Sequence, residues 1–558
     1  AATSNQMFRR IDDFLSMHDI ETPVRLLHST AWLVDKFSPA RDPELDADGE
    51  LARQWFEPQR RGLLSPWAVG TVDQAMMAAL KIKYQFLRLL GLSSKVLIID
   101  EAHAYDVYMT TILERLLSWC SVLQIPVIIL SATLPADKRR SLMQAYAGHI
   151  TAPGLVSSGK DYPQLTHVDL SGNITERTIC TVHGQNVVDV DIWPGALGDW
   201  ERVADRAVLM AGKGGCICVI VNTVKEAQQL YKIVSERADE TIWVRLFHSR
   251  YCVGDRLEIE RVCLKAFGKT SLLAEQRGGN SSRPAKAILI ATQVVEQSLD
   301  LDFDAMITAL APIDLILQRM GRMHRHEGRK RPPDYAKPVL TVLSPHDGGD
   351  LGPSAYVYEP WLLRKTLEIL RHYEHISTAN DIRPLIEKVY SEIPAPNHQN
   401  YDDWAEMINK IEDDKNKARV YLLPQPNKDQ FTLSMIQEKF ADPEASSEWF
   451  RARTRQGDDN CQVILLDPAD FSHIGDKAYM ISLDQAKKIM LSMVNIPAYW
   501  LANTSPAEGF TAMVEGTGRL SGRNLLEIRE GRWEGQDSSK RGVNLIYDKI
   551  FGARLERK

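Results

Sequence analysis

The stretch "KVLIIDEAHAYDVYM", residues Lys95 to Met109, joins an apolar run to two adjacent carboxylates and a histidine. A short, uninterrupted apolar run is typical of a strand that is buried on both faces of a parallel sheet. At the carboxyl end of such a strand, side chains leave the sheet and enter the crevice where α/β proteins bind ligands. We therefore expect Asp100 and Glu101 to lie at a ligand site.

The same alternation of short apolar strands and amphipathic helices continues through the first three-fifths of the chain. It predicts an α/β fold with parallel sheets. The polar connection near residues 155–200 divides the strands into two groups, which indicates two lobes. The expected strands are "VRLLHS", "VGTV", "VLIID" and "VIILSAT", then "CICVIVNT", "TIWVRLFHS", "AILIAT" and "AMITAL", and the expected helices include Val72–Leu90, Val107–Val122 and Val224–Arg237.

The rest of the chain has a different character. A charged, mostly helical segment is followed by strand signals at "CQVILLD" and "NLIYD" around a helix near Leu483–Val494. The Gly/Ser/Arg-rich run Ala274–Lys286 predicts an exposed loop. The expected domains are a first lobe at 1–155, a second lobe at 156–360, a helical linker at 361–445 and a small C-terminal accessory domain at 446–558.

Composition limits the classes of function. The chain has 558 residues, a net charge of -6 and a pI near 6.2, which exclude a uniformly basic surface, so any nucleic acid must bind in a local groove. Seven scattered cysteines indicate reduced thiols and a cytoplasmic protein. Cys216 and Cys218 fall in an apolar run and are expected to pack in a core. No apolar run approaches the roughly 20 residues that span a bilayer, so no membrane partner is expected.

The two carboxylates have distinct expected tasks. Asp100 would hold Mg²⁺ that is coordinated to nucleotide phosphates, and Glu101 would orient and deprotonate the attacking water. The alternative is a solvated turn in which Asp100 caps the next helix. The following strand ends in Ser131-Ala132-Thr133, whose hydroxyls can bond across to the acidic strand. We expect Ser131 and Thr133 to couple its state to a substrate groove.

Arginines gather in the second lobe. The segment "LILQRMGRMHRH" carries Gln318, Arg319, Arg322 and Arg325. Guanidinium groups bind phosphate bidentately and stabilise the charge that develops during phosphoryl transfer, so Arg322 and Arg325 are candidate catalytic residues. A basic, solvated helix face is the alternative for any arginine-rich run.

The motifs resemble those of DEAH-type superfamily 2 helicases. The strings "GTVDQ", "DEAHAYD", "SATLP", "ATQVVEQSLDLD" and "QRMGRMHRH" most closely resemble the helicase–nuclease family of type I CRISPR interference, and "ARTRQGDDNCQVILL" with "NLIYDKIFG" resembles the accessory domain of its type I-E branch. The resemblance implies two RecA-like lobes, ATP and Mg²⁺ as cofactors, 3′-to-5′ movement on single-stranded DNA, and recruitment by the RNA-guided Cascade complex. It also implies an HD nuclease domain that holds Mn, Co, Ni or Fe.

The resemblance assigns roles to further residues. Thr292 would contact the nucleic-acid backbone and Asp300 would approach the nucleotide, although Ser298 stands where the superfamily usually has glycine. The candidates for nucleotide binding are Asp100, His103, Asp300 and Gln318, and those for nucleic-acid binding are His28, Ser29, Thr71, Thr223, His248 and Thr292. Each of the latter could equally cap a helix or satisfy a core hydrogen bond.

Two parts of this family are expected upstream of Ala1. "ATSNQMF" resembles the motif that follows the phosphate loop, so the first lobe is expected to be truncated and the HD nuclease to be absent. Gly268-Lys269-Thr270 is not that loop, because a helix precedes it and Cys263 replaces the first glycine. His18-Asp19 and His346-Asp347 lack further metal ligands. A generic superfamily 2 helicase, or a module that binds DNA without hydrolysing ATP, stays open.

Overall fold

The protein divides into two compact units. Unit 1 comprises Ala1–Gln185, Pro360–Lys365 and Ser377–Gly457, and unit 2 comprises Asn186–Glu359, Thr366–Ile376 and Asp458–Lys558. The structure is a computed structural model. It describes residues 2–20, 22, 24–28, 31, 62–82, 85–148, 163–169, 173–179, 187–276, 282–296, 299–426, 454, 460–467, 480–481, 483–501, 513–514 and 524–557.

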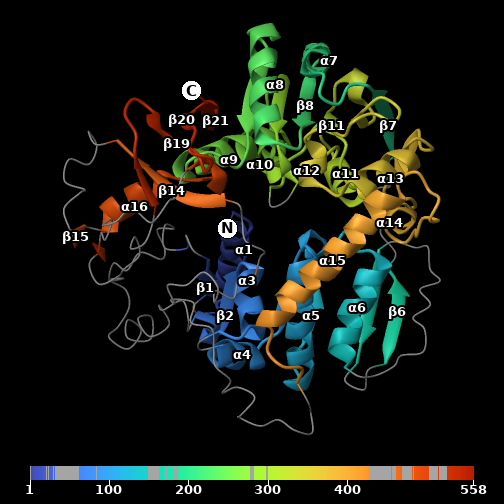
Figure 1. The fold of residues 1–558 in the computed structure, drawn as a ribbon, viewed down its shortest axis with the longest axis vertical. Coiled ribbons are helices and arrows are strands. Elements are labelled where there is room, and N and C mark those ends of the chain that lie inside the picture. Colours follow the sequence, from blue (N-terminus) through green and yellow to red (C-terminus); the bar gives the residue numbers. More distant parts are fainter. Residues whose placement is uncertain are drawn as a thin grey trace. The chain divides into compact units, whose positions relative to one another are not determined.

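Unit 1 contains three pairs of strands with helices between them (Figure 1). The pairs β1–β2 and β3–β4 are parallel, as the apolar runs predict, but β3 is not buried on both faces as expected, because Ile98 is 60% exposed. The pair β5–β6 is an antiparallel hairpin inside the segment that the sequence suggested was a connection. The elements are α1 (Ala2–Met17), β1 (Val24–Leu27), β2 (Trp67–Gly70), α3 (Val72–Met76), α4 (Gln85–Ser93), β3 (Leu97–Ile99), α5 (Val107–Val122), β4 (Val127–Ile129), α6 (Ala136–Ala147), β5 (Gln164–Val168), β6 (Ile174–Thr178), α14 (Ile382–Tyr390) and α15 (Tyr401–Tyr421).

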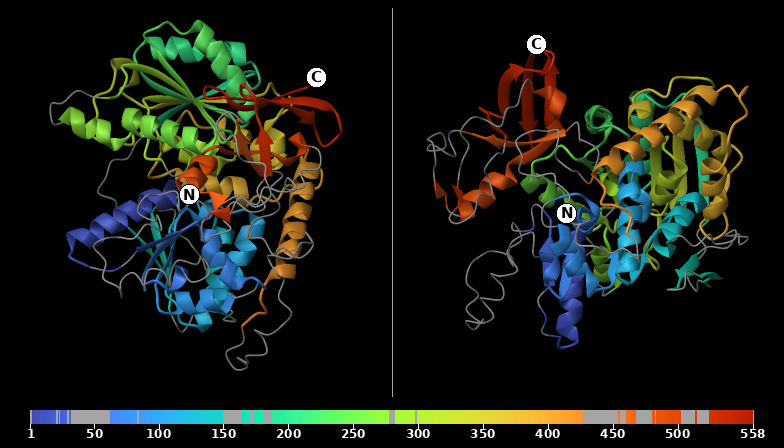
Figure 2. Two further views of the ribbon diagram at one scale, coloured as in Figure 1. Left: turned by 90° about the vertical axis from the view of Figure 1, so that its left-hand side faces the viewer. Right: turned by 60° about the horizontal axis from the view of Figure 1, so that its bottom comes forward.

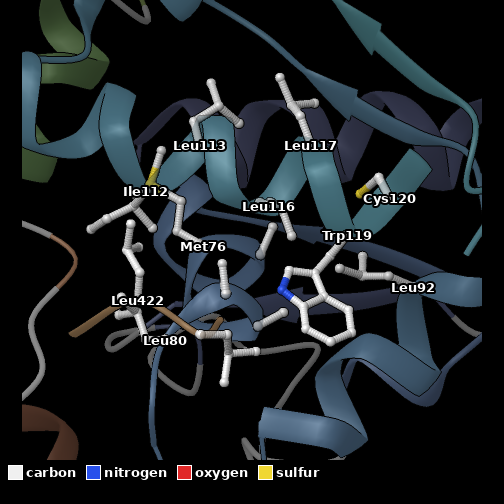
Figure 3. Close-up of a cluster of buried hydrophobic side chains, with 14 of the residues drawn as sticks. Met76, Leu80, Leu92, Ile112, Leu113, Leu116, Leu117, Trp119, Cys120 and Leu422 are labelled. Atoms are coloured by element: carbon white, nitrogen blue, oxygen red, sulfur yellow. The ribbon is translucent and has the colours of Figure 1, made fainter. Parts of the chain in front are cut away.

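The core of unit 1 surrounds helix α5 (Figure 3). Trp119 is 1% exposed, and Ile112, Leu116 and Leu117 on the same helix are at most 1% exposed. Leu422, directly after α15, packs into the same cluster. The core that supports the acidic strand β3 therefore includes a residue more than 300 positions away in the sequence.

One predicted helix is broken. Instead of one helix over Val72–Leu90, the chain forms α3, a 3₁₀ turn and α4. Between them, the Lys81 amide donates to the Tyr421 carbonyl at 2.8 Å, and the Leu423 amide donates to Ala79 at 2.8 Å. The prediction was wrong here because backbone pairing with a distant segment replaced the helical hydrogen bonds.

Unit 2 is built on a parallel sheet with strand order β7-β12-β11-β8-β10-β9, and β13 (His375–Ser377) lies beside β7. Figure 2 shows the green and yellow strands of this sheet with helices around them. This order confirms the expected α/β class, and helices α7 and α8 cover one face. The sequence reading missed β7 and β12. The elements are β7 (Val187–Pro194), α7 (Trp200–Gly212), β8 (Gly215–Ile220), α8 (Val224–Arg237), β9 (Trp243–Phe247), α9 (Val253–Phe267), α10 (Lys269–Gln276), β10 (Lys286–Ala291), β11 (Ala305–Ala309), α11 (Ile313–Met320), β12 (Val339–Ser344), α12 (Ser354–Val357) and α13 (Pro360–Leu370), whose last turns lie in unit 2.

The C-terminal strands pack against this lobe within unit 2. The strands β14 (Asn460–Leu466), β16 (Met493–Pro497) and β18 (Asn524–Glu527) form one sheet, and β19 (Arg532–Gln536), β20 (Gly542–Asp548) and β21 (Gly552–Arg557) form another. Gly552 has φ +68°, and a Cβ there would lie 2.4 Å from the Arg250 carbonyl oxygen. Helix α16 (Leu483–Leu491) ends earlier than predicted, because Met493–Pro497 pairs with β14.

Several smaller predictions are also settled. Cys216 and Cys218 are fully buried core residues, and burial raises the pKa of the Cys216 thiol to about 12. The expected loop Ala274–Lys286 begins as the end of α10, and 277–281 lie outside the described residues. None of the described helices has the length and apolar character that crossing a bilayer requires.

Candidate nucleotide site and its coupling residues

The acidic residues lie in a tight turn after β3. Asp100 is exposed, and its Oδ1 accepts a hydrogen bond from the Glu101 amide at 2.9 Å. Glu101 adopts φ 55° and ψ 42°, a left-handed conformation that non-glycine residues rarely adopt and that concentrates at functional sites. Asp106, rather than Asp100, caps helix α5, by accepting from the Met109 amide at 2.7 Å. The alternative role of Asp100 as a helix cap therefore does not apply.

His103 connects this turn to the end of β4. Its Nε2 lies 3.2 Å from Glu101 Oε2, and its Nδ1 lies 3.0 Å from Ser131 Oγ. The contact of Nδ1 with Ser131 is a hydrogen bond, whereas the contact of Nε2 with Glu101 has an ion-pair distance without hydrogen-bond geometry. The His103 side chain is 1% exposed, whereas that of Glu101 is 41% exposed. Glu101, His103 and Ser131 thus form one row of polar contacts from an open carboxylate to the neighbouring strand.

The second coupling candidate lies in the same segment. Thr133 is buried at 3% exposure. Ser131 and Ala132 line a cavity of about 890 Å³ within unit 1. The structure therefore brings Ser131 to the acidic strand and places Thr133 in the interior just beyond it.

The chemistry of the turn suits magnesium bound to phosphates. Mg²⁺ prefers oxygen ligands, keeps several waters, and is usually held by one or two carboxylates together with substrate phosphates. Asp100 offers one exposed carboxylate of this kind. Among the residues that the structure describes, no cluster of three or more His, Cys, Asp or Glu side chains could hold a metal by itself. His18-Asp19 and His346-Asp347 accordingly belong to no such cluster.

In unit 2 the arginine segment follows α11. Arg319 is completely buried and binds Glu296 Oε1 at 2.6 Å and Thr308 at 2.6 Å. Arg322 is 7% exposed and donates to the main-chain carbonyls of Leu299 and Glu296. Both guanidinium groups therefore hold the segment itself together.

Arg325 differs from these two arginines. Its side chain is 44% exposed, and Nε donates to Asp300 Oδ1 at 2.7 Å. His326 Nε2 lies 3.0 Å from the same oxygen, and these hydrogen bonds hold the pKa of Asp300 well below its ordinary value. Gln318 is partly buried on α11. Of the predicted residues in this segment, Arg325 thus has the most exposed guanidinium group.

Comparison with known proteins decides the family. Residues 213–328 match the model of the C-terminal part of the CRISPR-associated nuclease/helicase Cas3. A CRISPR-associated endonuclease/helicase Cas3 from Thermus thermophilus is 32% identical over 83% of this chain and 55% of its own length. The chain belongs to the Cas3 family. It spans little more than half of that relative.

Solved Cas3 structures have the same fold. The T. fusca Cas3 structure with ATP is 30% identical and superposes with a TM-score of 0.83 over 99% of this chain and 64% of that one. A CRISPR RNA-guided surveillance complex in a pre-nicking state contains a chain that is 26% identical, with a TM-score of 0.72 over 99% of this chain and 66% of that one. The likeness therefore extends over both units.

The structure places the nucleic-acid candidates of this Cas3-family chain in varied surroundings. Thr71 is partly buried at the start of α3, and Thr292 is 2% exposed after β10. His28 is 6% exposed, binds Asn5 at 2.8 Å, and its pKa is lowered to about 4 by burial. Ser29 and Ser298 lie outside the described residues. These positions leave their nucleic-acid role a prediction.

Two of these candidates have local bonds that favour a structural role. Thr223 forms a capping box with Glu226 at the start of α8. His248 is fully buried: Nδ1 accepts from the Arg250 amide at 3.1 Å, and Nε2 bonds to the Phe551 carbonyl at 3.0 Å. His248 thus connects the second lobe to its C-terminal strands.

Sequence reasoning missed this connection between the lobe and its C-terminal strands. Gln228 donates to the carbonyl of Phe551 at 2.6 Å, and the Cys252 amide donates to Tyr547 Oη at 3.0 Å. Arg250 stacks over the Trp500 ring at 4.6 Å. No local motif marks a glutamine or an arginine as a packing residue, so only pairing across the fold reveals them.

Gly268-Lys269-Thr270 joins α9 to α10, which agrees with its rejection as a phosphate loop.

Proposed function

We propose that this chain is the helicase portion of an ATP-dependent, CRISPR-associated nuclease/helicase. In the complete protein, ATP hydrolysis would drive 3′-to-5′ movement on single-stranded DNA after recruitment by Cascade. The unwound strand would pass to an HD nuclease that uses a transition metal such as Mn, Co, Ni or Fe. The proposed location is the cytoplasm, where its thiols stay reduced.

The row Glu101–His103–Ser131 carries the proposal. It combines an exposed carboxylate with a buried contact to the next strand. An ATP-driven helicase needs both, because it must hydrolyse ATP and transmit the resulting change to its DNA-binding residues. The names of the relatives and the ATP in a solved Cas3 structure support nucleotide binding. The surveillance complex supports Cascade as a partner.

The residues have separate proposed tasks. Glu101 would accept the proton of the attacking water, and His103 would keep its carboxylate in position. Asp100 would hold Mg²⁺, which supplies positive charge to the phosphates when it is bound. Asp300 and Gln318 would approach the nucleotide, and Arg325 would stabilise transition-state charge; Arg322 would do so only after its guanidinium left the Leu299 and Glu296 carbonyls. Ser131 and Thr133 would transmit the change to the DNA-binding groups Thr71 and Thr292.

The test measures ATP hydrolysis by the complete protein with single-stranded DNA or RNA of matched length. We expect DNA to stimulate hydrolysis more than RNA, and a duplex with a 3′ tail to be unwound in preference to one with a 5′ tail. DNA binding should weaken steeply with salt and be insensitive to base sequence. Equal stimulation by RNA would favour a generic helicase. DNA binding without hydrolysis would favour a binding module.

A further inference from the structure

Helix α6 follows the coupling segment directly and is only lightly buried. It begins at Ala136, three residues after Thr133, and only Leu142 and Ala147 on it are buried. The cavity of about 890 Å³ lies among α5, β4, α6, β5 and α14. Dispersion contacts are missing across such a space, so apolar packing alone fixes α6 weakly on that side. Leu142 in the core and the Tyr146 hydroxyl, which donates to the Ile125 carbonyl at 3.0 Å, hold its C-terminal half, whereas polar contacts position its first turn.

One of these contacts reaches the acidic turn. Lys138 Nζ donates to the Tyr105 carbonyl at 2.6 Å and lies 3.4 Å from the His103 carbonyl. Both carbonyls belong to the turn that carries Glu101. A charge-assisted hydrogen bond is roughly twice as strong as a neutral one. Lys138 thus ties α6 to the main chain of the acidic turn.

A second contact of the first turn of α6 reaches α14. The residue before α6 is Pro135, which has no side-chain acceptor, so the helix has no cap of its own. Instead, Glu387 Oε1 on α14 accepts from the Ala136 amide at 3.2 Å. Ser391 Oγ donates to the other oxygen of Glu387 at 3.1 Å and orients it. A carboxylate at a helix N-terminus also interacts favourably with the helix dipole.

A second set of bonds supports the same junction. Arg383, one turn before Glu387, donates to Gln164 Oε1 on β5 at 2.8 Å. Arg139 on α6 donates to the same oxygen and lies 3.4 Å from Glu176 on β6. Helix α14 therefore holds the first turn of α6 both directly and through the hairpin.

We propose that α6 is a lever between α14 and the acidic turn, with Lys138 and Glu387 as its two positioning residues. This rests on the proposed function. Helix α14 begins six residues after Ile376, the last residue of a segment that belongs to unit 2. A displacement of α14 moves the cap of α6, and Lys138 carries the displacement to the turn of Glu101 and His103.

The experiment compares Glu387→Ala, Glu387→Gln and Lys138→Met in the complete protein. Arg140→Ala is the matched control, because Arg140 on α6 forms an exposed pair with Asp137 and touches neither anchor. In Glu387→Gln, the side-chain amide oxygen can still accept the hydrogen bond from the Ala136 amide. Two quantities are measured: DNA strand separated per ATP hydrolysed, and hydrogen exchange of the peptides that contain Tyr105 and Ala136.

Glu387→Ala should lower the strand separated per ATP about fivefold, the effect of a lost helix cap, while DNA-stimulated hydrolysis changes little. Exchange should rise at Ala136 and also at Tyr105. Lys138→Met should raise exchange at Tyr105 alone, Glu387→Gln should restore most of the coupling, and Arg140→Ala should match the wild type.

Two results would overturn the lever. One is unchanged exchange at Tyr105 in Glu387→Ala. The other is an equal fall in hydrolysis and strand separation in Glu387→Ala that Glu387→Gln does not rescue, which indicates general destabilisation. Absence of ATP hydrolysis in the wild type would instead refute the proposed function, and the exchange data would then decide the lever on their own.

Discussion

The acidic turn of unit 1 and the arginine–aspartate cluster of unit 2 use charged residues in opposite ways. In the turn, Asp100 is exposed and Glu101 is 41% exposed at its side chain. In the cluster, Asp302 and Asp304 are 0% and 2% exposed. The partners of these two aspartates are Arg283, Arg329 and Arg331, at 2.7–2.9 Å for the closest pairs.

The difference shows which charges are available for chemistry. Burial raises the cost of ionising Asp304, but Arg283 and Arg331 outweigh it and lower the pKa of this carboxyl. Every carboxylate oxygen of the cluster has a partner, so none of them is open to a ligand. The turn instead leaves carboxylate oxygens exposed on a strained backbone, where a ligand can compete for them.

The largest expected effect is on turnover. Glu101→Gln should reduce ATP hydrolysis by the complete protein by about 10²–10⁴-fold, because it removes the general base, while nucleotide binding persists. Its stability should change by less than about 1 kcal/mol. Steady-state kinetics and denaturant unfolding measure the two quantities. Near-normal hydrolysis would remove Glu101 from this role.

A substitution in the arginine–aspartate cluster should instead have its main effect on stability. Arg331→Met leaves Asp302 and Asp304 partly unpaired in the interior and should lower the free energy of unfolding by about 3–5 kcal/mol. Arg261→Met, at an exposed pair with Glu258, is the control and should behave like the wild type. Denaturant titration of both variants is the measurement. A small loss in Arg331→Met would mean that the cluster is not a stabilising core.

A pH experiment probes a buried neutral group. Burial lowers the pKa of His248 to about 3, from an ordinary value of 6.5. Below pH 6.5 the unfolded chain therefore binds a proton at His248 that the folded chain does not bind. The contribution of neutral His248 to the free energy of unfolding is complete above pH 6.5 and falls as the pH drops toward 3. Between pH 7.5 and 5 the loss is about 2 kcal/mol.

His248→Gln keeps a donor for the Phe551 carbonyl and should remove this part of the pH dependence. Unfolding free energies at pH 7.5 and 5 give the difference between variant and wild type. His18→Gln, at an exposed histidine after α1, is the matched control variant. An unchanged slope in His248→Gln would show that His248 does not stay neutral in the folded protein.

We expect the smallest effect on stability from loss of the partly exposed ion pair between Arg325 and Asp300 in unit 2. Arg325→Ala removes a partly exposed ion pair with Asp300 and should cost at most about 1 kcal/mol, less at high salt. If Arg325 acts on transition-state charge, kcat falls more than nucleotide affinity. Equal losses in both would make the residue a binding group. Unfolding at two salt concentrations and ATPase kinetics separate these outcomes.

Local sequence determined much of this protein. The apolar runs predicted eight strands that the structure contains, and α5 and α8 have the predicted bounds, because periodicity and capping residues act over a few positions. The motif around Asp100 predicted an acidic turn at a strand end. The hydroxyl of Ser131 was expected to reach the acidic strand, and it lies 3.0 Å from His103.

Only the tertiary structure decided the rest. Pairing of residues 79–81 with the chain at the end of α15 broke a helix that its own sequence favours, and β7 and β12 were recognised only in the assembled sheet. Burial of Arg322 and His248, and the cap that Glu387 gives to α6, join residues far apart along the chain. A hydrogen bond between such residues depends on where the whole chain places them, and no local pattern encodes that distance.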